Sequence, residues 1–125
     1  MSFRALRVAA AVLFAVAAVN HAVLASRGQG VVWRHELFVG INLVLGALIA
    51  LRPRWALPPI ALLSLQQIPS HGMDLVRSFD QPRAQDWDWP SLGVVFFFPA
   101  VIALLVVERR RSGRPEAPRT GPPGS

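Results

Sequence analysis

The 125-residue sequence contains no cysteine. Disulfides, iron–sulfur clusters, thiolate zinc sites and thiol catalysis are therefore excluded. Charged residues are also scarce, at 16% of the chain, whereas a typical soluble domain has about 25%. Hydrophobic residues make up 53% and come in long blocks, which indicates a membrane-embedded chain. Four spans of about 20 residues would use nearly the whole length and leave no room for a soluble catalytic domain.

Lysine is absent as well, so all thirteen basic residues are arginine and the net charge is +6. A balance this basic raises the question of nucleic-acid binding. The arginines, however, lie between the apolar blocks and in the tail, with no basic face interleaved with aromatic residues. We therefore expect no nucleic-acid partner and interpret the arginines as charges at membrane boundaries.

The apolar blocks predict an all-α fold, an integral membrane four-helix bundle with helices over about 4–25, 33–51, 57–79 and 89–108. Residues 1–111 form the membrane domain, and the Arg-, Pro- and Gly-rich residues 112–125 are predicted to be a disordered tail. The first block has an alternative, because residues 1–25 also resemble a cleavable signal peptide. The third block spans a membrane only if it continues to about Phe79, and a half-helix followed by an amphipathic segment is the alternative.

The distribution of arginines predicts the orientation. Nine arginines lie on the side of the two termini, namely Arg4, Arg7, Arg52, Arg54, Arg109, Arg110, Arg111, Arg114 and Arg119. The other four lie on the opposite side, namely Arg27, Arg34, Arg77 and Arg83. The positive-inside rule then places both termini and the tail in the cytoplasm. We expect a multi-pass protein of a cell membrane, the bacterial inner membrane. In architecture alone, this plan is similar to many small bacterial membrane proteins, including the DoxX-type class.

Polar residues at membrane depth gather in the outer half of the predicted bundle. With a rise of about 1.5 Å per residue, all three histidines and two carboxylates lie above the midplane of the bilayer. Ionisable groups at this depth usually face a bundle interior or a cavity. The sequence therefore predicts an outward-facing polar pocket whose ligand-binding residues are His21, His35, Glu36, Gln67, His71 and Asp74.

Several of these residues also have an ordinary structural explanation. Asn42 and Gln67 lie near the midplane, where they are expected to form a polar contact between helices. Asp74 is expected to pair with Arg77, three residues later. His71, which follows Pro69 by two residues, is the histidine that packing explains least well.

Three histidines and a carboxylate suit zinc or copper(II), with His21, His35 and His71 as the metal ligands, although no local ligand motif joins them. Haem is disfavoured because the chain has no attachment motif. Ser70, His71 and Asp74 do not form a catalytic triad, because adjacent residues of a helix point about 100° apart. No complete catalytic constellation is present, so an enzyme ranks third among the hypotheses.

The sequence thus predicts a small polytopic membrane protein whose outward-facing His/Glu/Asp pocket binds a metal ion, a proton or a small polar ligand. The alternative is a non-catalytic accessory or structural subunit of a larger membrane complex. The expected partners of the protein are the lipid bilayer and either another membrane protein or a second copy of the chain.

Overall fold

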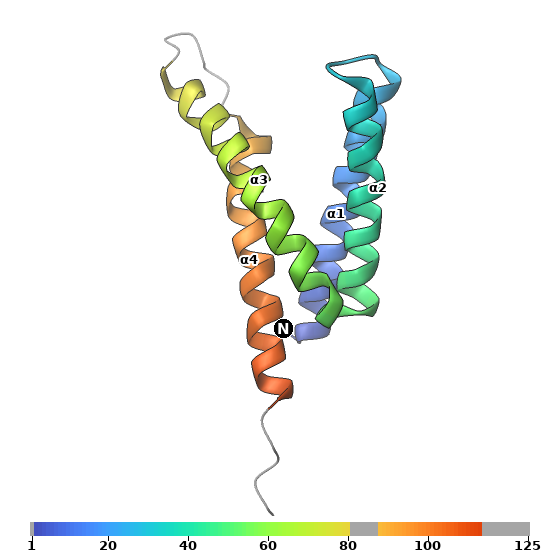
Figure 1. The fold of residues 1–125 in the computed structure, drawn as a ribbon, viewed down its shortest axis with the longest axis vertical. Coiled ribbons are helices and arrows are strands. Elements are labelled where there is room, and N and C mark those ends of the chain that lie inside the picture. The colour runs from blue at the N-terminus through green and yellow to red at the C-terminus, as the bar shows by residue number, and fades with distance from the viewer. Residues whose placement is uncertain (1, 81–87, 114–125) are drawn as a thin grey trace, which may run out of the picture.

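A computed structural model describes residues 2–80 and 88–113 of the chain. It contains four helices, α1 (Phe3–Ser26), α2 (Val32–Leu51), α3 (Pro53–Asp80) and α4 (Trp89–Ser112) (Figure 1). Within the described residues there is no strand, and the expected all-α architecture of four helices is confirmed. The predicted tail beyond residue 113 and the segment 81–87 lie outside the described residues.

Three of the helices, α1, α2 and α4, are long and apolar enough to cross a membrane. The remaining helix, α3, has 28 residues and is therefore about 42 Å long. It is continuous through Pro69. Gln66, Gln67 and His71 make α3 less apolar than its neighbours, and α3 packs along α4.

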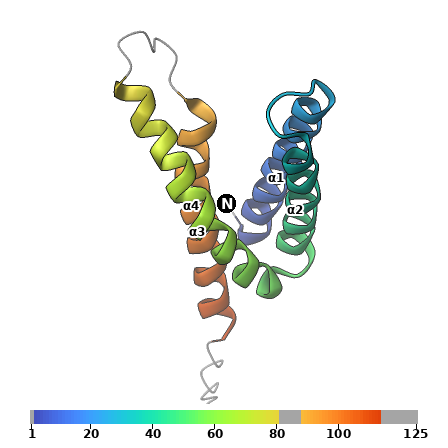
Figure 2. The same ribbon diagram turned by 45° about the horizontal axis from the view of Figure 1, so that its top comes forward.

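The four helices form two pairs arranged as a V. The first arm consists of α1 packed against α2, and the second arm consists of α3 packed against α4. The arms meet at the end that carries the amino terminus and separate toward the other end (Figures 1 and 2). We call these the closed end and the open end. The open end therefore carries the α1–α2 turn and the beginning of α4.

A hydrophobic core joins all four helices. It comprises Ala10, Phe14, Leu45, Ile49, Ala56, Ile60, Phe98, Val101 and Leu105. Phe14 of α1 is only 1% exposed, and the centre of its ring lies 5.2 Å from that of Phe97 and 6.0 Å from that of Phe98, both in α4. Because Phe14 lies midway along α1, these contacts hold the two arms together below the level of the histidines.

The close approach of α1 and α2 depends on a small residue. A Cβ atom added at Gly46 would lie 3.2 Å from the backbone oxygen of Ala11 and 3.4 Å from the Cβ of Phe14. Small residues allow helices to pack at short distances in membranes, where tight packing is a main source of helix association. The absence of a side chain at Gly46 therefore keeps the first arm compact.

Two helix boundaries differ from the prediction. Only Arg52 separates α2 from α3, which begins at Pro53 rather than near residue 57, since a proline is tolerated in the first turn of a helix. The other difference is at α4, which continues to Ser112 through Arg109–Arg111 instead of ending at residue 108. Basic side chains in a last turn interact favourably with the helix dipole, so this arginine run extends the helix.

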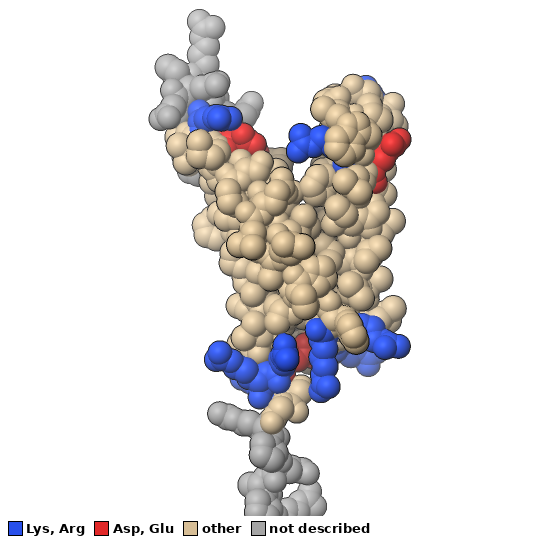
Figure 3. Space-filling view, in the orientation of Figure 1, with Lys and Arg blue, Asp and Glu red and all other residues tan. Residues whose placement is uncertain are grey.

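Arginine side chains collect at the closed end, as the space-filling view shows (Figure 3). The helix ends at this side of the molecule carry Arg4, Arg7, Arg54, Arg109, Arg110 and Arg111, and Arg52 lies between α2 and α3. Arg7 of α1 forms an ion pair with Glu108 of α4, with 3.4 Å between Nε and Oε1. The guanidinium of Arg111 lies over the ring of Phe3, 5.0 Å from its centre. These contacts add charged links between α1 and α4.

Candidate functional site

The three histidines lie in the part of the molecule where the arms have separated. His21 is in α1 and His35 in α2, so both belong to the first arm, whereas His71 is in α3, in the second arm. The space-filling view shows a notch between the arms at the open end, with charged side chains near its rim (Figure 3). The candidate site therefore consists of polar side chains from both helix pairs, near the notch that separates them.

His21 and His35 are in direct contact, and we call them the histidine pair. Their Nδ1 atoms are 2.9 Å apart, and their ring centres are 5.3 Å apart. A neutral imidazole has one N–H donor and one bare nitrogen acceptor. One Nδ1 atom of the pair therefore carries a proton that it donates to the other. This hydrogen bond ties the end of α1 to the beginning of α2.

The surroundings of the histidine pair restrict both rings. The ring of Phe38 stacks on His21, with 5.2 Å between the centres and 20° between the planes. Gly30, in the turn between the helices, has a φ of 64°, and a Cβ atom there would lie 3.2 Å from Nε2 of His35. A side chain at position 30 would therefore suffer both backbone strain and crowding against His35. The turn closes over His35 because this residue is glycine.

His71 has a different partner, Ser91, whose hydroxyl oxygen lies 2.9 Å from Nδ1 of the histidine. Ser91 is 3% exposed, and its backbone N–H donates to Oδ1 of Asp88 at 3.1 Å. Hydrogen bonds from the Ser91 hydroxyl and backbone N–H lower the pKa of Asp88 against the opposing effect of burial. A positive charge on His71 acts in the same direction, so the three groups are electrostatically linked.

The order of these three residues differs from that of a Ser–His–Asp triad. In a Ser–His–Asp triad the histidine lies between the other two and takes the proton of the serine. Here Ser91 lies between Asp88 and His71. In the described part of the chain, no carboxylate is hydrogen-bonded to His71, so the imidazole is not oriented as it is in a Ser–His–Asp triad.

Ser91 and Asp88 are not among the site residues predicted from the sequence. The sequence does indicate the capping role of Asp88, because an Asp followed two residues later by Pro is typical of a helix N-terminus. In the structure, Asp88 caps α4. No sequence pattern indicates that His71 meets Ser91, because that contact depends on how α3 and α4 are aligned.

The expected three-histidine site for zinc or copper is not assembled in this structure. Across residues 2–80 and 88–113, no three His, Asp or Glu side chains are close enough together to hold a metal ion. The physical reason is the V shape, since His21 and His35 lie on one arm and His71 on the other. His71 is nevertheless close enough to His21 for their charges to interact.

The two carboxylates of the predicted pocket have other roles. Glu36 is exposed and, in the described part of the chain, has no ion-pair partner. Asp74 forms the predicted ion pair with Arg77, with 3.7 Å between Oδ1 and the guanidinium nitrogen. Both of these side chains are at least half exposed, so the pair contributes little to stability.

The polar contact expected between Asn42 and Gln67 is replaced by bonds within each helix. The side chain of Asn42 donates to the backbone oxygen of Phe38 at 2.7 Å, and that of Gln67 donates to Gln66 at 2.5 Å. The expectation was wrong because α2 packs mainly against α1, while α3 packs mainly against α4. Asn42 and Gln67 are buried, at 7% and 9% exposure, each with a partner of its own.

Comparison with models of protein families, with curated proteins and with solved structures gives no match to this chain. The histidine pair offers two nitrogen atoms that compete for one proton, and His71 stands opposite with its Nδ1 held by Ser91.

Proposed function

We propose that this chain is a small multi-pass protein of the bacterial inner membrane that binds a proton in an outward-facing polar notch. The observation that supports the proposal is the 2.9 Å contact between the Nδ1 atoms of His21 and His35. Two imidazole nitrogens of the same kind at this distance make a hydrogen bond only if one proton lies between them. Histidine is also the side chain whose ordinary pKa allows such a change near physiological pH.

Proton uptake by the histidine pair proceeds in two distinguishable steps. The first added proton leaves one ring as an imidazolium that donates to the neutral ring, which makes the hydrogen bond stronger. The second added proton gives both Nδ1 atoms a hydrogen and both rings a positive charge. No acceptor then remains between them, and the like charges repel. The contact between α1 and α2 at the open end would thus be lost in acid.

The full-length protein labelled with ¹⁵N-histidine and reconstituted in micelles tests this proposal by NMR. We expect His21 and His35 to titrate in two separate steps, because the first proton charges a ring 2.9 Å from the second. In His35→Ala, His21 should titrate in one step, and the hydrogen bond of about 1 kcal/mol between the helices should be absent. His71→Ala removes the histidine of the opposite arm and is the matched control, in which the two steps should remain.

Two results would contradict the proposal. One is an independent, single-step titration of His21 and His35 in the wild-type protein. The other is a shift of both ring signals by one equivalent of Zn²⁺ at neutral pH with release of a proton, which would make the pair a metal site. His21→Ala should reproduce the effect of His35→Ala, so that failure of one variant to fold does not hide the result.

The orientation with both termini in the cytoplasm is part of the proposal. It is supported by the collection of arginines at the closed end, where the positive-inside rule requires an excess. We expect a reporter that is active only in the cytoplasm to be active when fused after Ser125, and a reporter active only in the periplasm to be silent there. The reverse pattern would turn the notch toward the cytoplasm. A mature amino terminus at Ser26 would instead identify α1 as a signal peptide.

A second candidate function is that of an accessory subunit in a larger membrane complex, with a partner protein or a second copy in the notch. The divergence of the arms favours it, because the α1–α2 and α3–α4 pairs do not cover each other at the open end. Cross-linking from single cysteines placed near the notch tests this in native membranes. The natural chain is free of cysteine, so each introduced thiol reports on one position.

A further inference from the structure

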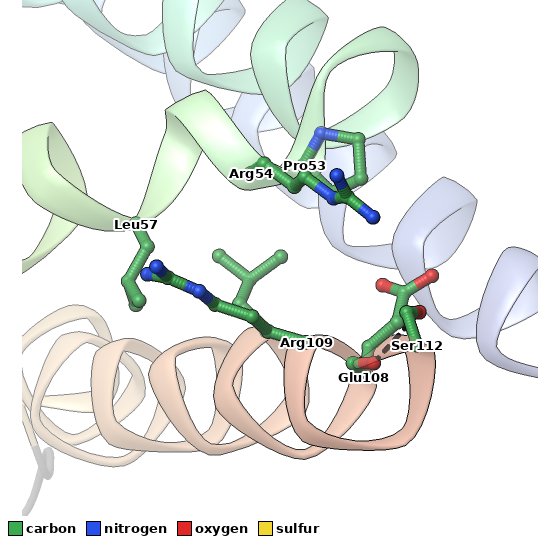
Figure 4. A pocket seen from close by; sticks show the side chains of 7 residues that line it. Pro53, Arg54, Leu57, Glu108, Arg109 and Ser112 are labelled. Carbon is green, nitrogen blue, oxygen red and sulfur yellow. Dashed lines mark hydrogen bonds between the residues drawn. The ribbon is translucent and has the colours of Figure 1, made fainter. Parts of the chain in front are cut away.

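A cavity lies at the closed end, far from the histidines, between the beginning of α3 and the end of α4 (Figure 4). Its volume is about 50 Å³, enough for roughly three or four water-sized groups. The lining is basic and apolar, with Arg54 and Arg109 beside Leu57 and Leu105, and with Glu108 and Ser112 at one side. In the close view, Arg54 and Arg109 extend from opposite helices on either side of the cavity.

The charges in this region are not balanced. Glu108 is the one carboxylate of the closed end in the described part of the chain, and it is paired with Arg7 from α1. Arg54 and Arg109 have no carboxylate partner among residues 2–80 and 88–113. Since Arg7 neutralises Glu108, that carboxylate does not cancel the positive charge that the two arginines present to the cavity. An anion is therefore the complementary ligand.

The position of the cavity identifies the kind of anion. Arg109 lies in the last turn of a helix that is apolar enough to span the membrane, so the cavity is at the level of lipid headgroups. Leu57 and Leu105 form an apolar wall beside the arginines. A second hollow next to it shares Leu57 and Arg109 and adds Val106 and Arg110. A ligand with a phosphate and an acyl chain fits a basic site bordered by such a wall.

We propose that Arg54 and Arg109 form a binding site for the headgroup phosphate of an anionic phospholipid in the leaflet at the closed end. The guanidinium groups donate to the phosphate oxygens from two helices, and the acyl chains run along the apolar wall. Arginine is suited to this role because its planar fork of N–H donors matches the oxygens of a phosphate. Basic pockets between membrane helices commonly bind headgroups in this way. The site does not depend on the proposed proton binding at the open end.

Titration of the delipidated full-length protein in neutral detergent with phosphatidylglycerol, followed by native mass spectrometry, tests the site. We expect one lipid per chain, with affinity about 100-fold weaker in R54Q/R109Q, because two charge-assisted contacts are lost. The matched control R4Q/R52Q removes two exposed arginines of the same end that do not line the cavity, and it should weaken binding less than about 3-fold. Arg109→Gln alone is measured beside the double variant, so that a folding defect of the latter does not hide the result.

Three outcomes would overturn the proposal. An equal loss in R54Q/R109Q and R4Q/R52Q would mean that lipid is attracted by the general surface charge. Equally tight binding of phosphatidylethanolamine, whose headgroup has no net charge, would show that an anion is not selected. Equally tight binding of glycerol phosphate would assign the site to a soluble phosphate compound rather than to a lipid.

Discussion

Phe14→Ala is expected to lower the free energy of unfolding by about 3 to 5 kcal/mol, the range for a buried phenylalanine reduced to alanine. Phe14 is 1% exposed, and its ring contacts Phe97 and Phe98 across the junction of the two arms. The remaining cavity cannot close easily, because α1 and α2 are already so close beside it that a Cβ atom added at Gly46 would lie 3.2 Å from the backbone oxygen of Ala11. Unfolding by sodium dodecyl sulfate in mixed micelles, followed by circular dichroism, measures the change.

Phe96→Ala is the matched control for this prediction. Phe96 is in the same helix as Phe97 and Phe98 but is 68% exposed, so it contacts lipid rather than the core. We expect its replacement to change the free energy of unfolding by about 0.5 kcal/mol or less. If Phe14→Ala and Phe96→Ala have equal effects, the arms are not held together by the aromatic contacts at their junction.

Arg7→Leu is expected to lower the free energy of unfolding by about 3 kcal/mol, because it leaves the carboxylate of Glu108 without its partner in a confined position. The two side chains are only 18% and 21% exposed, and Oε2 of Glu108 is buried without a hydrogen bond. Removing both charges in R7L/E108L should cost less than Arg7→Leu alone, since no unpaired charge then remains. The same unfolding measurement, arranged as a double-mutant cycle, gives the coupling energy.

The ion pair of Asp74 and Arg77 provides the comparison. It has the same charges but lies in solvent, with side chains 51% and 70% exposed. Arg77→Leu should therefore change the free energy of unfolding by less than about 1 kcal/mol. An equally small effect of Arg7→Leu would show that Glu108 is neutral or hydrated in the folded protein, and that its pairing with Arg7 does not join α1 to α4.

The helices could be predicted from the sequence because their signals are local. Apolar blocks bounded by arginine placed α1 and α2 to within a residue at each end. The beginning of α3 was predicted too late. Pro53 follows the end of α2 by only two residues, so it was interpreted as ending that helix and not as the first residue of the next one. For α4, the apolar block ended at Val107, although the arginines after Glu108 continue the helix.

The site was predicted less completely, because its contacts depend on which helices pair. Depth along each helix indicated correctly that His21 and His35 lie at a similar level, and the structure brings their rings together. The depth of a residue along its helix does not indicate how the helix is rotated about its axis or how far apart the two arms are. For that reason, the contact of His71 with Ser91 and the separation of His71 from a common metal site were not foreseen.

The V shape described for the two arms has a consequence for the bilayer itself. Because the arms meet at one end and diverge at the other, the outline of the molecule is wider at the level of the histidines than at the level of the arginines. Such a wedge displaces unequal areas of lipid from the two leaflets. The surrounding membrane accommodates this inequality with least strain when it bends around the wider end, so the protein is expected to concentrate where the leaflet at its open end is on the convex side.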